Sequence, residues 1–321
     1  MILQINMTTK SSWLKQCGTV LIAAVFIALV ISCQPQAKTG EQRTFSSPDE
    51  AVKALVGALK AEDTKMLSVI FGPGSEDIIS SGDPVADKAE HERFINRYEQ
   101  KNRLEEETTE KVILSIGDDD WPLAIPIVKE AGVWRFDTQE GREELLARRI
   151  GRNELDVIQV CLAIVDAQRE YARKDRNGDG FREYAQKFRS NSGIQDGLYW
   201  KAKEGEEQSP FGPLITEAQE KGYSGRPVSS EPIPYYGYYY RILTAQGQNA
   251  PGGTNDYIVD GKMIGGFAAV AYPADYANSG VMTFIVNHDG VVYQKDLGGN
   301  TGELAKAMTL YDPDETWTPV Q

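Results

Sequence analysis

The feature that most constrains the fold is a long helical pattern of apolar residues from about Arg142 to Lys174. Apolar side chains recur at helical spacing along the whole segment, and a second stripe lies beside the first in its middle. The first stripe comprises Leu146, Ile150, Val157, Cys161, Ile164 and Tyr171, and the second comprises Leu155, Ile158, Leu162 and Val165. Two adjacent stripes predict a helix buried on a wide face, as when a sheet wraps around it. Cys161 is then a small core residue rather than a nucleophile.

The residues after this helix supply β-prone runs for such a sheet. A tyrosine-rich run, 234–244, opens the series, and the runs 267–272, 282–287 and 291–295 continue it. The last two are joined by Asp-Gly, which favours a hairpin and makes His288 a turn residue rather than a catalytic base. The order of long helix, loop and antiparallel meander resembles the globular part of type IV pilins and pseudopilins. A polymerising pilin subunit is not expected, because here the long helix is internal.

The first half of the chain predicts helices followed by strands. Ser47-Pro48-Asp49-Glu50 is a capping box, and it opens a helix with one apolar stripe. Further helices are predicted at about 64–70 and 86–103, and β-prone runs follow at 112–116, 123–129 and 133–137. This order indicates an α+β fold and resembles the cystatin-like cone of nuclear-transport-factor-2-type domains. We therefore expect an α+β protein with two domains, residues 45–138 and 139–321.

The amino terminus carries a predicted export signal over residues 1–32. It has two lysines, no acidic residue and an apolar run from Val20 to Ile31, which is too short for the roughly 20 residues of a membrane span. The run ends in Ser32-Cys33 and resembles a bacterial lipobox, which implies lipidation of Cys33 as the first residue of the processed chain. Residues 33–44 are a tether. Gln34 after the cysteine implies the periplasmic face of the outer membrane.

The composition disfavours several classes of binding partner and of active site. The chain has 34 Lys and Arg against 47 Asp and Glu, a net charge of −13, so nucleic acid is not an expected partner. It has two histidines and three cysteines, and no Gly-x-Ser-x-Gly, His-Glu-x-x-His or P-loop motif. Catalysis by a pair of carboxylates remains an alternative, because acidic residues are abundant. No catalytic residue and no cofactor other than calcium is predicted.

A calcium loop is the one metal site that the spacing suggests. Asp175, Asn177 and Asp179 place side-chain oxygens at alternate positions before Gly180, as in the first half of an EF-hand loop. The twelfth position is Gln186 instead of the required glutamate, so the loop is not an EF-hand. A weaker site completed by Glu183 is one interpretation, and a turn that uses these residues for its backbone geometry is the other.

The tyrosines of the run at 234–244 suggest a ligand platform. Side chains alternate between faces along a strand, so some of these rings are expected to be exposed. Tyr236, Tyr238 and Tyr240 share one face and are the predicted platform for a sugar or peptide, with ordinary packing as the alternative.

Several short stretches resemble the bacterial domain-of-unknown-function 2950 family over residues 45–317. They are Trp121-Pro, Trp134-Arg-Phe-Asp137, Arg149-Ile-Gly-Arg-Asn-Glu-Leu155, Ala167-Gln-Arg-Glu-Tyr171, Asp196-Gly-Leu-Tyr-Trp200, Ala250-Pro-Gly-Gly253 and Thr283-Phe-Ile-Val-Asn287. The resemblance carries no activity and no site residues.

The function expected is that of a non-catalytic envelope lipoprotein, anchored to the membrane through Cys33, which binds an envelope protein or a cell-wall ligand. The alternatives are a secreted hydrolase with a carboxylate pair and a calcium-stabilised, pilin-related assembly factor.

Overall fold

The first helices form where their caps and apolar stripes predict them. The computed structural model describes residues 41–203, 205–221, 223 and 234–320. In α1 (Pro48–Lys60) the Ser47 hydroxyl accepts a hydrogen bond from the Glu50 amide, and six apolar residues are buried. Helix α2 (Thr64–Phe71) is capped by Asp63 and ends at Gly72, whose φ of 84° suits glycine.

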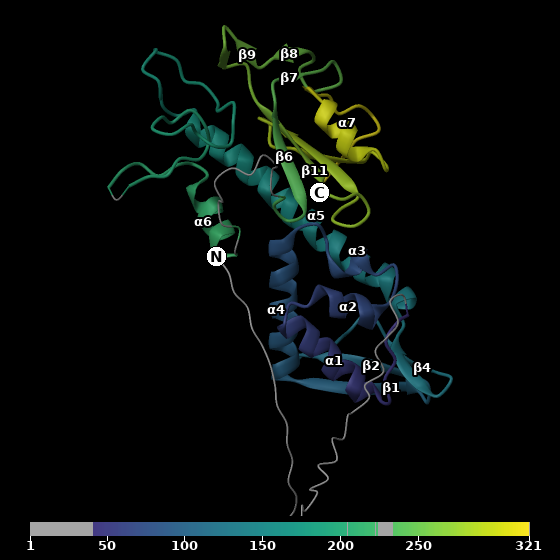
Figure 1. Cartoon of the computed structure of the whole chain (residues 1–321). Helices are drawn as coiled ribbons and strands as arrows, with labels where there is room; N and C mark the ends of the chain where they lie inside the picture. Colours follow the sequence, from purple (N-terminus) through teal and green to yellow (C-terminus); the bar gives the residue numbers. More distant parts are fainter. Residues whose placement is uncertain (1–40, 204, 222, 224–233, 321) are drawn as a thin grey trace, which may run out of the picture. The chain divides into compact units, whose positions relative to one another are not determined.

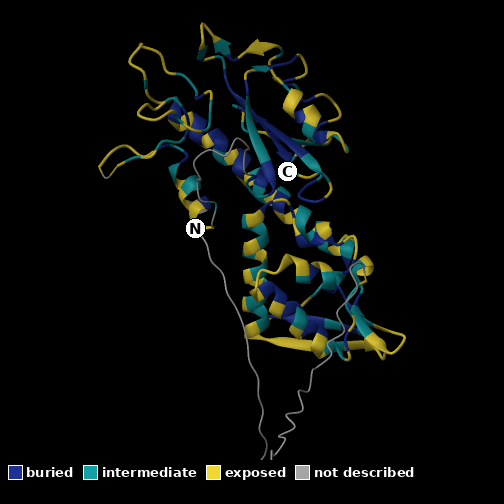
Figure 2. Cartoon of the chain, in the orientation of Figure 1, coloured by how far each residue is buried: buried dark blue, intermediate teal, exposed yellow. Residues whose placement is uncertain are grey.

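The next two helices are more exposed. The short α3 (Glu76–Ile79) leads to α4 (Pro84–Gln100), where the Asp83 carboxylate accepts hydrogen bonds from two amides of the first turn. No residue of α4 is fully buried, so this helix lies on the outside of the fold (Figure 2). It ends three residues before the position that the sequence predicts.

An antiparallel sheet completes this first region. Its strands are β1 (Asn102–Thr108), β2 (Lys111–Ile116), β3 (Trp121–Pro122), β4 (Ile127–Glu130) and β5 (Val133–Phe136). The order is β1-β2-β4-β5, and β3 pairs with β2. Helices α1 and α2 contact β5, and α4 contacts β1 and β2 (Figure 1). The predicted helix–sheet order is therefore present, with β1 as an additional polar strand.

The long helix α5 spans Thr138–Tyr171, close to the predicted 142–174. Its first turn is capped by Asp137, and Gly141 packs so closely on Ile125 that a Cβ atom would lie 2.5 Å from the Ile125 Cα. Fully or nearly buried residues concentrate between Asn153 and Tyr171, where α5 packs on the second sheet. Cys161 is buried there, as predicted, and burial raises the pKa of its thiol to about 12.

A long irregular segment, of which residues 172–203 and 205–211 are described, follows α5 and is held by side chains. The Gln168 amide exchanges two hydrogen bonds of 2.8 Å with the main chain of Ala185. The Arg176 guanidinium lies over the rings of both Tyr171 and Trp200, at 4.8 and 4.9 Å from their centroids. Helix α6 (Gly212–Glu220) comes next.

The second sheet packs against α5. Its strands are β6 (Tyr238–Leu243), β11 (Ala268–Pro273), β12 (Met282–Asn287), β13 (Val292–Asp296) and β15 (Thr318–Pro319), in the order β15-β13-β12-β11-β6. All pairings are antiparallel, and the β12–β13 hairpin turns at His288 as predicted. Smaller elements surround it: β7 (Ala245–Gln246), β8 (Asn255–Asp256), β9 (Ile258–Val259), β10 (Lys262–Met263), α7 (Thr301–Ala307) and β14 (Leu310–Tyr311).

The buried apolar residues fall into two clusters. One contains α1, α2 and the first sheet, and the other contains α5 and the second sheet (Figures 1 and 2). The described part of the chain is thus a mixed α+β fold with antiparallel main sheets, as predicted, and it belongs to one compact unit, Ala37–Gln321. Among the described helices, none is both long and apolar enough to span a membrane. The predicted export signal lies outside the described residues.

Candidate functional site

Helix α7 and strand β14 pack on the second sheet, and Arg241 shows that α7 covers the face opposite to α5. Neighbouring residues of β6 point to opposite faces, and the ring of Tyr240 lies near Cys161 of α5. Arg241 therefore points away from α5, and its guanidinium donates hydrogen bonds to the Ala305 and Met308 carbonyls at the end of α7. Cations at a helix C-terminus are favourable. This contact fixes α7 and the start of the chain that follows it.

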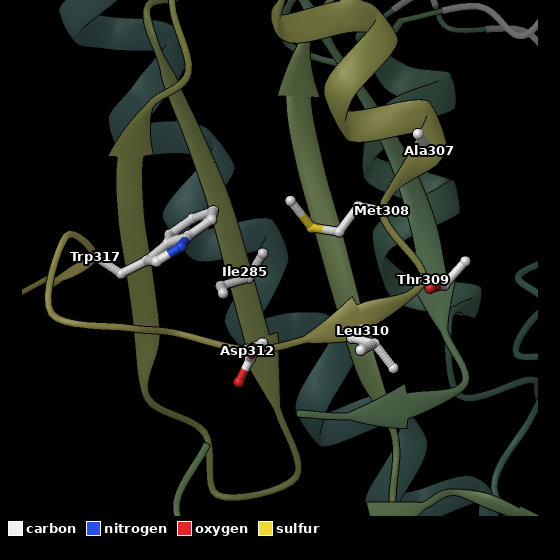
Figure 3. Close-up of a pocket in the computed structure, with 7 residues that line it drawn as sticks. All are labelled: Ile285, Ala307, Met308, Thr309, Leu310, Asp312 and Trp317. Carbon is white, nitrogen blue, oxygen red and sulfur yellow. The ribbon is translucent and has the colours of Figure 1, made fainter. Parts of the chain in front are cut away.

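A cleft of about 340 Å³ opens in this layer of α7 and β14. Figure 3 shows Ile285 of β12 between the side chains of Met308 and Trp317. The cleft is lined by Ile285, Ala307, Met308, Thr309, Leu310, Asp312 and Trp317. Ile285 and Trp317 are buried, whereas Leu310 is 43% exposed. The cleft thus has apolar side chains on its floor, polar groups elsewhere in its lining and an accessible rim, and its volume is in the range of ligand sites.

One side of the cleft is the free edge of a strand. In the described residues β14 pairs only with β7, in parallel, and Tyr311 accepts a hydrogen bond from the Gly247 amide. Main-chain groups alternate in direction along a strand, so those of Leu310 and Asp312 point away from β7. Both residues line the cleft. An extended chain in the cleft could therefore pair with β14.

The polar residues around the cleft are held by specific contacts. Asn249 donates hydrogen bonds to both carboxylate oxygens of Asp312, from its amide nitrogen at 2.7 Å and its side chain at 3.0 Å. A Cβ atom on residue 247 would lie only 2.2 Å from the carboxylate carbon of Asp312, so glycine is the residue that fits there. The Lys295 ammonium lies 5.7 Å from the Trp317 ring and contacts Thr316. These contacts hold Asp312 and Trp317 in place at the cleft.

The rim of the cleft is acidic. Asp312 lines the cleft, Asp314 and Glu315 follow it closely in the sequence, and the positive charge of Lys295 acts on Asp314. Hydrogen bonds from Thr316 lower the pKa of Asp314. Asp312 is thus the carboxylate of the cleft itself, and two further acidic residues lie next to it in the sequence.

A second concave site, of about 400 Å³, lies beside α4. The end of α1, the start of α2, the end of α3 and one face of α4 line it. These residues are Leu59, Lys60, Glu62, Thr64, Ile79, Ser80, Pro84, Asp87, Lys88, His91, Glu92 and Ile95. His91 is half-buried in this groove rather than on an open surface, because α3 and the α1–α2 corner flank its helix.

The predicted calcium residues lie together in the turn after α5, with partners of their own. Asp175 accepts hydrogen bonds from the amides of Gly178 and Gly180. The Asn177 side chain donates to Asp179 at 2.9 Å and to Glu183 at 3.0 Å, and Lys262 forms an ion pair with Asp179. Within the described residues, no group of three or more His, Cys, Asp or Glu is arranged to hold a metal ion. Calcium binding stays a prediction.

The three predicted platform tyrosines have different surroundings. Tyr238 has no exposed surface, and its hydroxyl donates to the Met282 carbonyl at 3.0 Å. Burial raises the pKa of Tyr240 well above its usual value, and its hydroxyl bonds to the Tyr235 carbonyl. Tyr236 lies against Lys221, whose ammonium is 4.9 Å from the ring centroid. The three rings therefore do not form one exposed surface.

A polar motif of α5, residues 148–154, connects elements that are distant in sequence. Arg149 donates hydrogen bonds to the Asp77 and Ile78 carbonyls and to the Asn278 side chain, and burial lowers the pKa of its guanidinium. On the next turn the Glu154 carboxylate accepts the Val281 and Met282 amides at 3.0 and 2.9 Å. The motif thus ties α5 to both α3 and the β11–β12 loop.

Sequence reasoning missed both concave sites. Residues 308–317 contain no motif, and the cleft arises only where α7 and β14 cross the sheet. Leu310 and Trp317 are large apolar residues in this stretch, and their spacing does not indicate a cleft. The groove at His91 depends on the packing of α3 and gives no signal of its own. Cys33 lies outside the described residues.

The fold and these two sites define an α+β protein with an apolar cleft beside a free strand edge. The family model that matches residues 42–320 is described as "Protein of unknown function (DUF2950)". The match covers most of the chain, and the chain therefore belongs to this family. No curated protein and no solved structure was found to be similar to it.

Proposed function

We propose that the protein is a non-catalytic lipoprotein of the bacterial envelope that binds an extended, basic segment of another envelope protein. The observation that carries this proposal is the cleft of Figure 3, where the free edge of β14 lies beside an apolar floor. An extended peptide adds to such an edge through its main chain, and alternate side chains enter the adjacent pocket. A basic sequence suits the acidic rim.

The anchor of this proposal is Cys33. A basic start, a short apolar run and Ser32-Cys33 support export and lipidation, and Gln34 supports the outer membrane. The segment 33–44 would tether the folded part to the membrane surface. We further propose a division near residue 139 into a cystatin-like domain and a pilin-like domain, supported by the two hydrophobic clusters.

Metabolic labelling with palmitate tests the anchor. The full chain is expected to incorporate the label and to sediment with membranes, and Cys33→Ser is expected to lose both properties. Cys161→Ser is the matched control, because its thiol is buried. Equal labelling of the Cys33→Ser protein would show that the anchor is wrong.

Calorimetric titration with synthetic octapeptides tests the cleft. Peptides that alternate valine with lysine are expected to bind, and peptides that alternate valine with glutamate are not. Leu310→Arg is expected to weaken binding by at least about tenfold, since it repels the lysines and blocks the rim. Leu304→Arg is the control, because Leu304 has a similar exposure, 49% against 43%, but does not line the cleft.

Two outcomes would overturn the cleft as a peptide site. One is equal binding of the lysine and glutamate peptides, and the other is equal loss in both arginine variants. Binding of cell-wall oligosaccharides in place of peptides would assign the cleft to a different ligand.

A further inference from the structure

The groove beside α4 has the construction of a small-molecule site. Its volume of about 400 Å³ is within the usual range for such sites. Leu59 and Ile79 are 7% and 8% exposed, and Ile95 packs on the same cluster, so the three form an apolar floor. Polar side chains surround this floor. A ligand there would bury an apolar part and keep a polar end near the rim.

The His91 side chain makes no hydrogen bond within the described part of the chain, although it lines the groove. Its imidazole donates to and accepts from no described residue, whereas the neighbouring Asp87 carboxylate is held by the Ser80 hydroxyl and by Ser81. Burial lowers the pKa of His91, so the imidazole is neutral at neutral pH. The charged groups that face it are Asp87, Glu90, Glu62 and Arg149. A neutral imidazole offers one donor and one acceptor.

The charges of the rim disfavour an anion. Three carboxylates and two lysines line the groove: Glu62, Asp87, Glu92, Lys60 and Lys88. Lys88 forms an ion pair of 3.1 Å with Glu62, and Lys60 pairs with Glu99 outside the groove. Glu92 has no ion pair within the described part of the chain. Carboxylates therefore balance the charges of both lysines, and the carboxylates of Asp87 and Glu92 leave the groove with a net negative charge.

We propose that this groove binds a small amphipathic molecule. Its apolar part lies on the floor formed by Leu59, Ile79 and Ile95, and its neutral or cationic end forms a hydrogen bond with His91. A ligand hydroxyl can both donate to and accept from the imidazole, and an amine is also attracted by Glu92. The N-terminus of α2 would otherwise attract an anion, but the Asp63 carboxylate already caps it. The site is separate from the β14 cleft and does not depend on the function proposed for that cleft.

Histidine NMR with three matched probes tests the proposal. The full chain in detergent, labelled with ¹³C-histidine, gives two ring signals because it contains two histidines, and His91→Gln assigns them. Benzylamine and benzyl alcohol are expected to shift the His91 signal to saturation. Benzoate is expected to bind roughly tenfold more weakly than benzyl alcohol, because its charge meets the carboxylates. His288 serves as the internal reference.

A pair of variants on α2 locates the probe. Thr64→Tyr places a ring in the groove and is expected to weaken binding of benzyl alcohol by at least about tenfold. Ser68→Tyr is the control, because Ser68 is exposed on the same helix and does not line the groove. The proposal is wrong if no probe moves the His91 signal, if benzoate binds as tightly as benzyl alcohol, or if both tyrosine variants bind equally.

Discussion

The buried side chains of α1 and α2 are all apolar, whereas α5 also buries polar side chains. In the first region six apolar residues of α1 account for its buried face. In the second, Asn153 and Gln168 are buried on α5 and bond to the main chain of distant segments. Long irregular segments can pack only if their main-chain groups find such partners. The second region should therefore be more sensitive to the loss of single contacts.

The largest effect is expected in the core of the second sheet. Tyr238→Ala should lower the free energy of unfolding by about 4 kcal/mol, because a fully buried ring and its hydrogen bond to Met282 are lost. Tyr239 is the matched control: it lies on the opposite face, 5.7 Å from the Tyr272 ring, and is only partly buried. Tyr239→Ala should cost about 1–2 kcal/mol. Urea denaturation measures both, and equal losses would contradict the assignment of the two faces.

The sequence predicts the elements whose signals are local. The apolar stripes predict α1 and α5, the caps at Ser47 and Asp63 mark the starts of two helices, and Asp289-Gly290 marks the β12–β13 hairpin. The sequence does not predict β1, because Asn102–Thr108 is largely polar and mostly exposed, and the predicted helix 86–103 covers its first two residues. It is a strand only because it pairs with β2 over its length.

Contacts between distant segments are the part that the sequence does not predict. Arg148, Arg149 and Arg152 lie close together in the sequence, and nothing in their spacing distinguishes one from another. The structure separates them: Arg149 turns toward α3 and Asn278, whereas Arg148 and Arg152 pair with glutamates. The sequence does not predict α7, because this helix is short and its end is held by Arg241, 64 residues before Ala305.

The second-largest loss of stability is expected when the hydrogen bonds from Arg149 to α3 and Asn278 are removed. Arg149→Met should lower the free energy of unfolding by about 3 kcal/mol, because two carbonyls and the Asn278 side chain lose a charged donor. Arg152→Met should cost less than about 1 kcal/mol, since Arg152 makes an exposed ion pair with Glu90. Thermal and urea unfolding distinguish the two. Similar losses in both variants would show that Arg149 is an ordinary surface residue.

A smaller effect is expected where α5 holds the irregular segment that follows it, residues 172–203 and 205–211. Gln168→Met should cost about 2 kcal/mol, because the amide and carbonyl of Ala185 are left buried without partners. Hydrogen exchange should accelerate first in residues 183–190, and in the first region it should remain unchanged. Gln159→Met is the control, because Gln159 is exposed on the same helix. Uniform acceleration over the chain would instead mean that the two regions unfold as one unit.

Calcium provides the smallest effect and the finest test of the same segment. A weak site with a Kd of about 1 mM would stabilise the protein by roughly 1.4 kcal/mol at about 10 mM calcium. The Lys262 ammonium competes for the Asp179 carboxylate, so we expect a smaller gain in the native chain and the full gain in Lys262→Met. Melting curves with calcium and with a chelator measure both, and Asp175→Asn should remove the gain. If neither the native chain nor Lys262→Met responds to calcium, the loop is a turn held by its own hydrogen bonds, because Asp175 already accepts the Gly178 and Gly180 amides.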